Sequence, residues 1–153
     1  MNKNVEASYE LTVYNGHTIN VNTVTREQAL AIEPQSVDHF LSPALGLLGF
    51  RTADGQWVEH RAALWPGLGD VGISIIQAIQ FNPGEFLSPK LVADITGCYS
   101  LHNAKALSAR LLALRKVHGE SFRQPHFFLS RKAGGFAIAW NPTHTWTLIE
   151  RID

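Results

Sequence analysis

The stretch from Leu87 to Gly119 limits most strongly what this chain can fold into, because its local signals fix where two helices begin and end. Its first part holds a good N-cap, a proline suited to the first helical position and a glycine that favours a stop. These three residues are Ser88, Pro89 and Gly97. They predict a short helix over about 89–96. Asn103 is a second good N-cap, so a longer helix should run from there to Gly119.

The longer helix has an apolar face and a basic face. Residues that fall in one turn-to-turn stripe are Ala104, Leu107, Leu111, Leu114 and His118. Residues on the opposite face are Lys105, Ala109 and Lys116. A short helix, a turn and a longer helix with a basic front are typical of a helix-turn-helix. The alternative is an ordinary helical hairpin whose lysine face is simply solvated.

The length of the chain fits a single domain, or one domain with an extension. The chain has 153 residues, of which 45% are hydrophobic and 17% charged, so it can form a real core. Its formal net charge is zero. Residues 1–80 carry four Lys and Arg against eight Asp and Glu, whereas residues 81–153 carry nine against five. We therefore expect a basic surface confined to one part of the fold.

Strand and turn signals lie on both sides of the helical stretch. Asn15-Gly16 and Asp54-Gly55 predict two hairpins, over residues 9–24 and 47–64. A short helix should follow the first hairpin to about Ile32, and a loop with one helical turn is expected over 34–46. The remaining expected elements are a helix from Asp70 to about Asn82, a hairpin over 126–140 and a final strand over 145–152. Strands and helices are segregated, which indicates the α+β class.

From about Leu47 to Trp140 this order resembles the winged-helix effector domain of OmpR/PhoB-type response regulators. Three stretches are similar to that family's pattern. The first is Gln80-Phe81-Asn82-Pro83-Gly84-Glu85-Phe86-Leu87-Ser88, the second is Ala113-Leu114-Arg115-Lys116 followed by Gly119, and the third is Arg131-Lys132-Ala133-Gly134-Gly135-Phe136-Ala137-Ile138. They correspond to the junction before the helix-turn-helix, the end of the recognition helix and the wing.

The resemblance implies a winged helix-turn-helix with an N-terminal antiparallel β-region, three helices and a C-terminal β-hairpin wing. Residues 1–46 would form a β-hairpin and short-helix extension, and residues 47–153 the winged-helix domain. Only 46 residues precede the match, so no receiver domain is expected. The implied function is a transcriptional regulator that binds double-stranded DNA with a recognition helix at about 103–118 and a wing at about 126–140.

The expected DNA contacts come from the helix front and from the wing. In the major groove they are Lys105, Ser108, Ala109, Leu112 and Lys116. Arg115 would contact phosphate, and Arg131 and Lys132 would reach the backbone or minor groove. The family's recognition helix usually has more Arg and polar residues in its N-terminal half. The alternative is therefore a winged-helix module that binds a protein and no DNA.

Other kinds of site have little support in the sequence. The seven histidines are scattered, and Cys98 is the only cysteine, so we expect no metal site, no cofactor and no disulfide, and a buried Cys98. Trp140, Trp146 and the nearby phenylalanines could stack on single strands, but core packing is the commoner role. No constellation of catalytic groups is present, so an enzyme is not expected.

The N-terminus has no apolar h-region and no run is long enough to span a membrane, so we expect a cytoplasmic protein. The N-terminal hairpin and the final strand should pair either within one chain or across a two-fold axis. Helix-turn-helix proteins commonly read two half-sites. We therefore expect a homodimer with residues 9–33 or 145–152 at the interface.

Overall fold

The computed structural model of the chain describes residues 10–15, 20–24, 26–61 and 68–152. It has mixed α+β structure, as the sequence predicts. The chain divides into two compact units. Unit 1 comprises Met1–Leu64 and His144–Asp153, and unit 2 comprises Trp65–Thr143.

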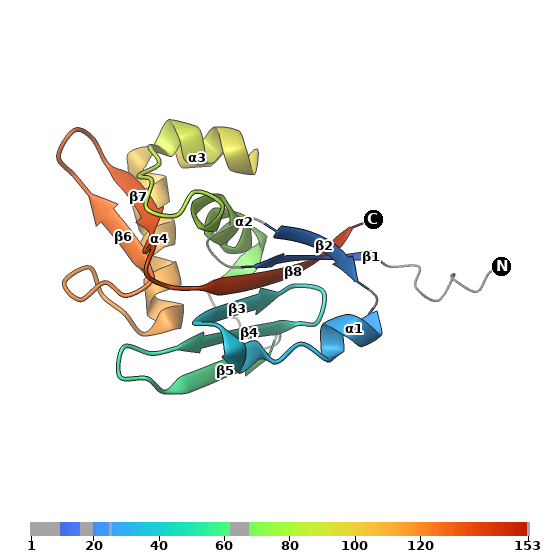
Figure 1. Cartoon of the computed structure of the whole chain (residues 1–153). Helices are drawn as coiled ribbons and strands as arrows, with labels where there is room; N and C mark the ends of the chain where they lie inside the picture. Colours follow the sequence, from blue (N-terminus) through green and yellow to red (C-terminus); the bar gives the residue numbers. More distant parts are fainter. Residues whose placement is uncertain (1–9, 16–19, 25, 62–67, 153) are drawn as a thin grey trace. The chain divides into compact units, whose positions relative to one another are not determined.

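Unit 1 is built on one sheet, to which six strands within the described ranges contribute in the order β2-β1-β8-β3-β4-β5 (Figure 1). The strands are β1 (Glu10–Asn15), β2 (Asn20–Val24), β3 (His39–Ser42), β4 (Leu47–Arg51), β5 (Trp57–Arg61) and β8 (Trp146–Ile152). β1 pairs antiparallel with β2, and β4 pairs antiparallel with β5. Both predicted N-terminal hairpins are thus confirmed in their described parts, whereas residues 9 and 16–19 of the first and residues 62–64 of the second lie outside the described residues.

Strand β8 joins the two ends of the sequence into one sheet. It pairs antiparallel with β1 on one side and parallel with β3 on the other. The N-terminal hairpin and the final strand therefore pair within one chain. Residues 47–64 belong to unit 1 as well, because β4 pairs with β3. The predicted domain boundary between residues 46 and 47 therefore does not coincide with the boundaries of the two compact units.

The prediction of a loop over 34–46 was wrong for its middle part. The expected helical turn is the 3-10 helix η2 (Pro34–Ser36), but His39–Ser42 forms the strand β3, and its four residues are buried. Its parallel partner β8 lies more than 100 residues further along the chain, so no local pattern marks it. The short helix α1 (Arg26–Leu30) was predicted, and its Ala29 packs in a core cluster with Phe40, Leu47 and Ile149.

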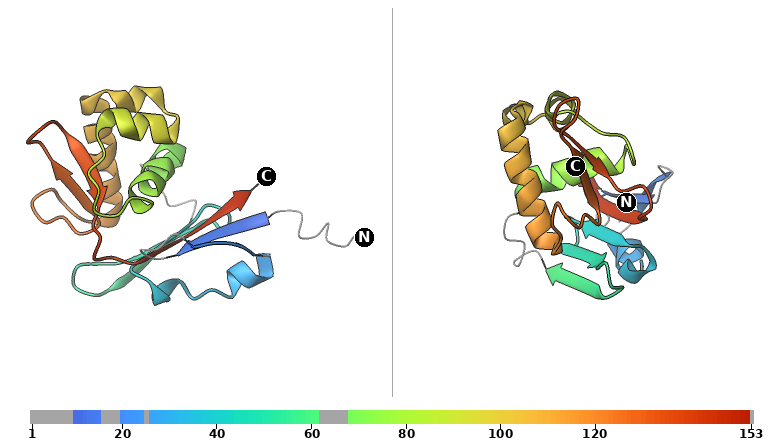
Figure 2. Two further views of the ribbon diagram at one scale, coloured as in Figure 1. Left: turned by 45° about the horizontal axis from the view of Figure 1, so that its top comes forward. Right: turned by 90° about the vertical axis from the view of Figure 1, so that its left-hand side faces the viewer.

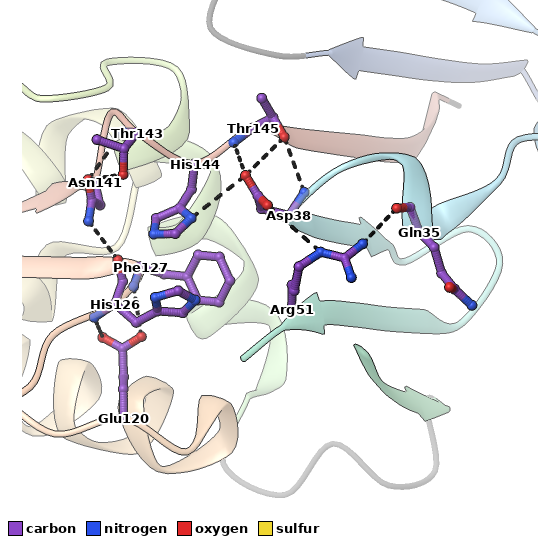
Figure 3. Close-up of polar contacts among 10 residues, drawn as sticks. All are labelled: Gln35, Asp38, Arg51, Glu120, His126, Phe127, Asn141, Thr143, His144 and Thr145. Carbon is purple, nitrogen blue, oxygen red and sulfur yellow. Dashed lines mark hydrogen bonds and ion pairs between the residues drawn. The ribbon is translucent and has the colours of Figure 1, made fainter. Parts of the chain in front are cut away.

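Asp38 fixes where β8 enters the sheet (Figure 3). Its carboxylate accepts hydrogen bonds from the backbone N–H of Thr145 (2.9 Å) and from the Thr145 hydroxyl (3.1 Å). The Asp38 backbone N–H donates to the same hydroxyl at 3.1 Å. His144 Nδ1 lies 3.7 Å from the carboxylate and Arg51 Nε lies 4.0 Å from it. These contacts join the starts of β3 and β8 within unit 1.

Unit 2 contains three α-helices, a 3-10 turn and a hairpin within the described ranges (Figure 2). The elements are α2 (Gly69–Gln80), α3 (Pro89–Thr96), η4 (Tyr99–His102), α4 (Ala104–His118), β6 (Phe128–Arg131) and β7 (Ala137–Trp140). Ser88 caps α3 by accepting the Leu91 N–H at 3.2 Å, and Gly97 ends the helix with φ 72°. The predicted bounds of α3 and α4 are confirmed. They could be predicted because helix caps are local sequence signals.

The core of unit 2 joins the helices to the hairpin. The fully buried side chains include Ile75, Ile76, Ile79, Leu101, Leu107, Leu114, Phe127, Phe128 and Trp140. Phe127 and Trp140 stack with their ring centroids 5.2 Å apart. Phe127, Phe128 and Trp140 therefore pack in the core, which removes these three residues as a stacking surface for single strands. Leu87, just before α3, forms a β-bridge with Ile138 and ties the helices to β7.

Candidate nucleic-acid interface

Helix α4 has firmly defined ends and a one-sided burial pattern. The Asn103 side chain accepts hydrogen bonds from the backbone N–H of Lys105 (2.8 Å) and of Ala106 (3.3 Å). At the other end Gly119 adopts φ 69°, a conformation that a residue with a Cβ rarely takes. The buried face includes Leu107, Leu111, Leu114 and His118, as the sequence predicts, whereas Ala104 is exposed.

The opposite face of α4 is exposed along its whole length. It carries Lys105, Ser108, Ala109, Leu112 and Lys116, five of the eight predicted contact residues. We call these five residues the α4 stripe. Leu112 has 68% of its surface exposed. The stripe has no acidic residue, and its two lysines lie three helical turns apart with small or apolar side chains between them.

Arg115 is not on this exposed face, contrary to its predicted role as a phosphate contact. Only 5% of its surface is exposed. Its Nη2 donates to the carbonyl oxygen of Phe128 at 2.7 Å and to the hydroxyl of Ser130 at 3.3 Å. The Nε atom lies 3.8 Å from a Glu120 carboxylate oxygen. The guanidinium is therefore used inside the unit, where it holds β6 against α4.

Glu120, the ion-pair partner of Arg115, was not predicted from the sequence. Figure 3 shows its carboxylate beside the backbone of His126 and Phe127. Its carboxylate accepts hydrogen bonds from the backbone N–H of His126 (3.3 Å), Phe127 (2.8 Å) and Phe128 (3.1 Å). The Asn141 side chain adds a hydrogen bond to the His126 carbonyl at 2.8 Å. Burial raises the pKa of Glu120 above its ordinary value of 4.5, against the lowering effect of these N–H groups and of Arg115. The carboxylate thus anchors the segment that leads into β6.

The hairpin β6–β7 presents the other two predicted residues. Arg131 and Lys132 are exposed at its end, where Gly134 and Gly135 take φ 79° and 102° and allow the tight turn. The Arg131 guanidinium lies 4.8 Å from the centroid of the Phe86 ring. Phe86 was not predicted as part of the site. A cation over an aromatic face loses part of its freedom, so Phe86 orients Arg131.

The charge is divided between the two units. Unit 2 contains eight Lys and Arg against four Asp and Glu, a net charge of +4, whereas unit 1 contains five against nine, a net charge of −4. Arg115 and Glu120 neutralise each other inside unit 2. Its other seven basic residues are exposed, including four on the α4 stripe and the hairpin end. The basic surface expected from the sequence is therefore located on unit 2.

The chain matches no family model, no curated protein and no solved structure. Its likeness to OmpR/PhoB-type effector domains consequently rests on the three sequence stretches and on the order of the elements.

Within the described ranges, no group of three or more His, Cys, Asp or Glu side chains could hold a metal ion. Cys98, which we expected to be buried, is half-buried, and its Sγ lies 3.3 Å from the Ser100 hydroxyl. None of the helices in the same ranges combines the length and apolarity that crossing a membrane requires.

Proposed function

We propose that unit 2 is a winged helix-turn-helix that binds double-stranded DNA and that the protein is a small transcriptional regulator. The observation that carries this proposal is the α4 stripe: an exposed helix face with a lysine near each end and no acidic residue. In this arrangement α3 and α4 are the two helices of the helix-turn-helix, α4 is the recognition helix and β6–β7 is the wing.

The chemistry of each surface suits a different part of the duplex. Ser108 and Ala109 are small, so the helix backbone could approach the floor of the major groove closely. Lys105 and Lys116 would pair with phosphates on the groove rims. Arg131 and Lys132 on the wing would reach backbone phosphates or the adjacent minor groove. Arg115 takes no direct part, because it is engaged with Glu120 and the Phe128 carbonyl.

A second candidate is a winged-helix module that binds a protein. The exposed apolar side chains of unit 2 favour it: Leu112 on α4, Leu91 and Ile95 on α3, and Tyr99, which is 86% exposed. A pulldown with the nucleic acid digested separates the two candidates. A partner bridged by DNA would be lost on digestion, whereas a partner bound directly would remain.

Salt-dependent binding to a short random-sequence duplex tests the DNA proposal. Fluorescence anisotropy should give a dissociation constant of about 10⁻⁴ to 10⁻⁶ M near physiological salt. Four lysine and arginine contacts with phosphate predict a slope of log K against log[salt] of about −3.6. No binding below about 100 µM at low salt would contradict the proposal.

Two substitutions locate the contact. Lys105→Ala should reduce the size of the salt slope by about 0.9, the value for one phosphate contact. Arg61→Ala is the matched control, because it removes an exposed positive charge from β5 in unit 1. The control should bind with the same slope as the wild-type protein. Equal slopes for both variants would place the contact elsewhere.

A further inference from the structure

The α4 stripe is poor in the groups that read bases by hydrogen bonding. Specific contacts in the major groove are usually made by Arg or Lys to guanine, by Asn or Gln to adenine and by carboxylates to cytosine. Between its two lysines the stripe offers only the Ser108 hydroxyl and the apolar side chains of Ala109 and Leu112. Arg110 is exposed as well, but it lies about 140° around the helix from the middle of the stripe.

Leu112 occupies the place on the stripe where a base contact would be made. One exposed leucine on a surface is ordinary by itself. This one lies between two lysines that are about 16 Å apart along the helix axis, given a rise of about 1.5 Å per residue. The major groove is about 12 Å wide. Lysine side chains at that separation would complement the phosphates on the rims and would place Leu112 and Ala109 over the base edges between them.

We infer that Leu112, with Ala109 beside it, is a contact surface for the 5-methyl group of thymine in the major groove. This inference rests on the proposed function and adds a ligand class to it. Thymine is the base whose major-groove edge carries a methyl group, and apolar side chains are the groups that recognise it. Such a site reads A·T-containing sequence by burying a methyl group, with the lysines supplying the attraction common to every sequence.

Duplexes that differ only in this methyl group test the inference. The first pair is a short duplex of alternating A·T pairs and the same duplex with deoxyuridine in place of thymidine. The second pair is a duplex of alternating G·C pairs and the same duplex with 5-methylcytosine, which puts a methyl group into the same groove. The wild-type protein should bind the methylated member of each pair about fourfold more tightly per contact, the factor expected for burying one methyl-sized group.

Variants assign the preference to Leu112. Leu112→Ala should show a smaller methyl preference than the wild-type protein, because most of the apolar contact surface is removed while Ala109 stays. Its exposed position allows the fold to be retained, which circular dichroism would check. Lys105→Ala should weaken binding to both members by one common factor and leave the preference unchanged. Leu112→Met, which keeps an apolar side chain, should retain the preference.

Failure of the inference and failure of the proposed function give different results. Equal, salt-dependent binding of the wild-type protein to both members of each pair would overturn the inference and leave DNA binding intact. A methyl preference in Leu112→Ala that is as large as in the wild-type protein would overturn the role assigned to Leu112. If the wild-type protein bound none of the four duplexes, both proposals would be overturned.

Discussion

Glu120 shows how one residue can connect the helix to the hairpin. It lies two residues beyond the end of α4. Its carboxylate accepts hydrogen bonds from three backbone N–H groups of the segment that enters β6, and it faces Arg115. Breaking a buried ion pair by removing one partner generally costs about 3–5 kcal/mol. The proposed contacts of α4 and of the hairpin end therefore depend on a side chain that touches neither surface.

The raised pKa of Glu120 predicts how stability depends on pH. The folded protein holds this proton to higher pH than the unfolded chain does, so the free energy of unfolding should fall as pH rises from about 4.5 through the folded pKa. Glu120→Gln cannot titrate and should lack this component. The wild-type protein should thus lose stability relative to the variant, by no more than about 1.4 kcal/mol per pH unit. Urea unfolding at several pH values measures the difference.

The matched control for this measurement is Glu85→Gln, which removes an exposed carboxyl group from the same unit. The same series of measurements on Glu85→Gln shows the effect of losing an exposed carboxyl group. A difference between wild-type and Glu120→Gln that stays constant, or that grows in favour of the wild-type protein as pH rises, would contradict the account.

At the scale of the element, α4 depends on its N-cap. Asn103→Ala removes the acceptor for the Lys105 and Ala106 N–H groups and should lower the free energy of unfolding by about 1 kcal/mol. Asn103→Asp keeps a side-chain oxygen and should lie close to the wild-type value. Denaturation midpoints of the three proteins provide the comparison. Equal midpoints for the alanine variant and the wild-type protein would show that the cap contributes nothing.

The same element shows what its sequence could and could not predict. The bounds of α4 and its exposed stripe followed from caps and periodicity, which are local signals. Arg115 was wrongly predicted to be exposed and to contact phosphate. It lies at the margin of the exposed face, and its burial depends on Glu120 and on the Phe128 carbonyl, which the fold brings back to the helix. For the same reason β3 was missed, since its parallel partner β8 is distant in sequence.

At the scale of the whole molecule, assembly remains a prediction. Among the described strands of unit 1, β2 lies at one edge of the sheet, and such an edge is suited to pairing with another chain. One short basic helix would bind DNA weakly by itself, whereas a two-fold pair would read two half-sites. We therefore expect a homodimer that involves residues 9–33. Light scattering should give twice the monomer mass of 16.9 kDa, and a monomer mass at every concentration would contradict this.

The proposed DNA surface lies on unit 2 alone. The positive net charge of unit 2, against the negative net charge of unit 1, supports this assignment. Backbone amide chemical shifts, followed by NMR while a short duplex is added at low salt, test this claim most directly. The account predicts that the largest changes fall on the α4 stripe and on residues 131–135, and that they reverse as salt is raised. Changes confined to β3, β4 and β5, or no changes at low salt, would contradict it.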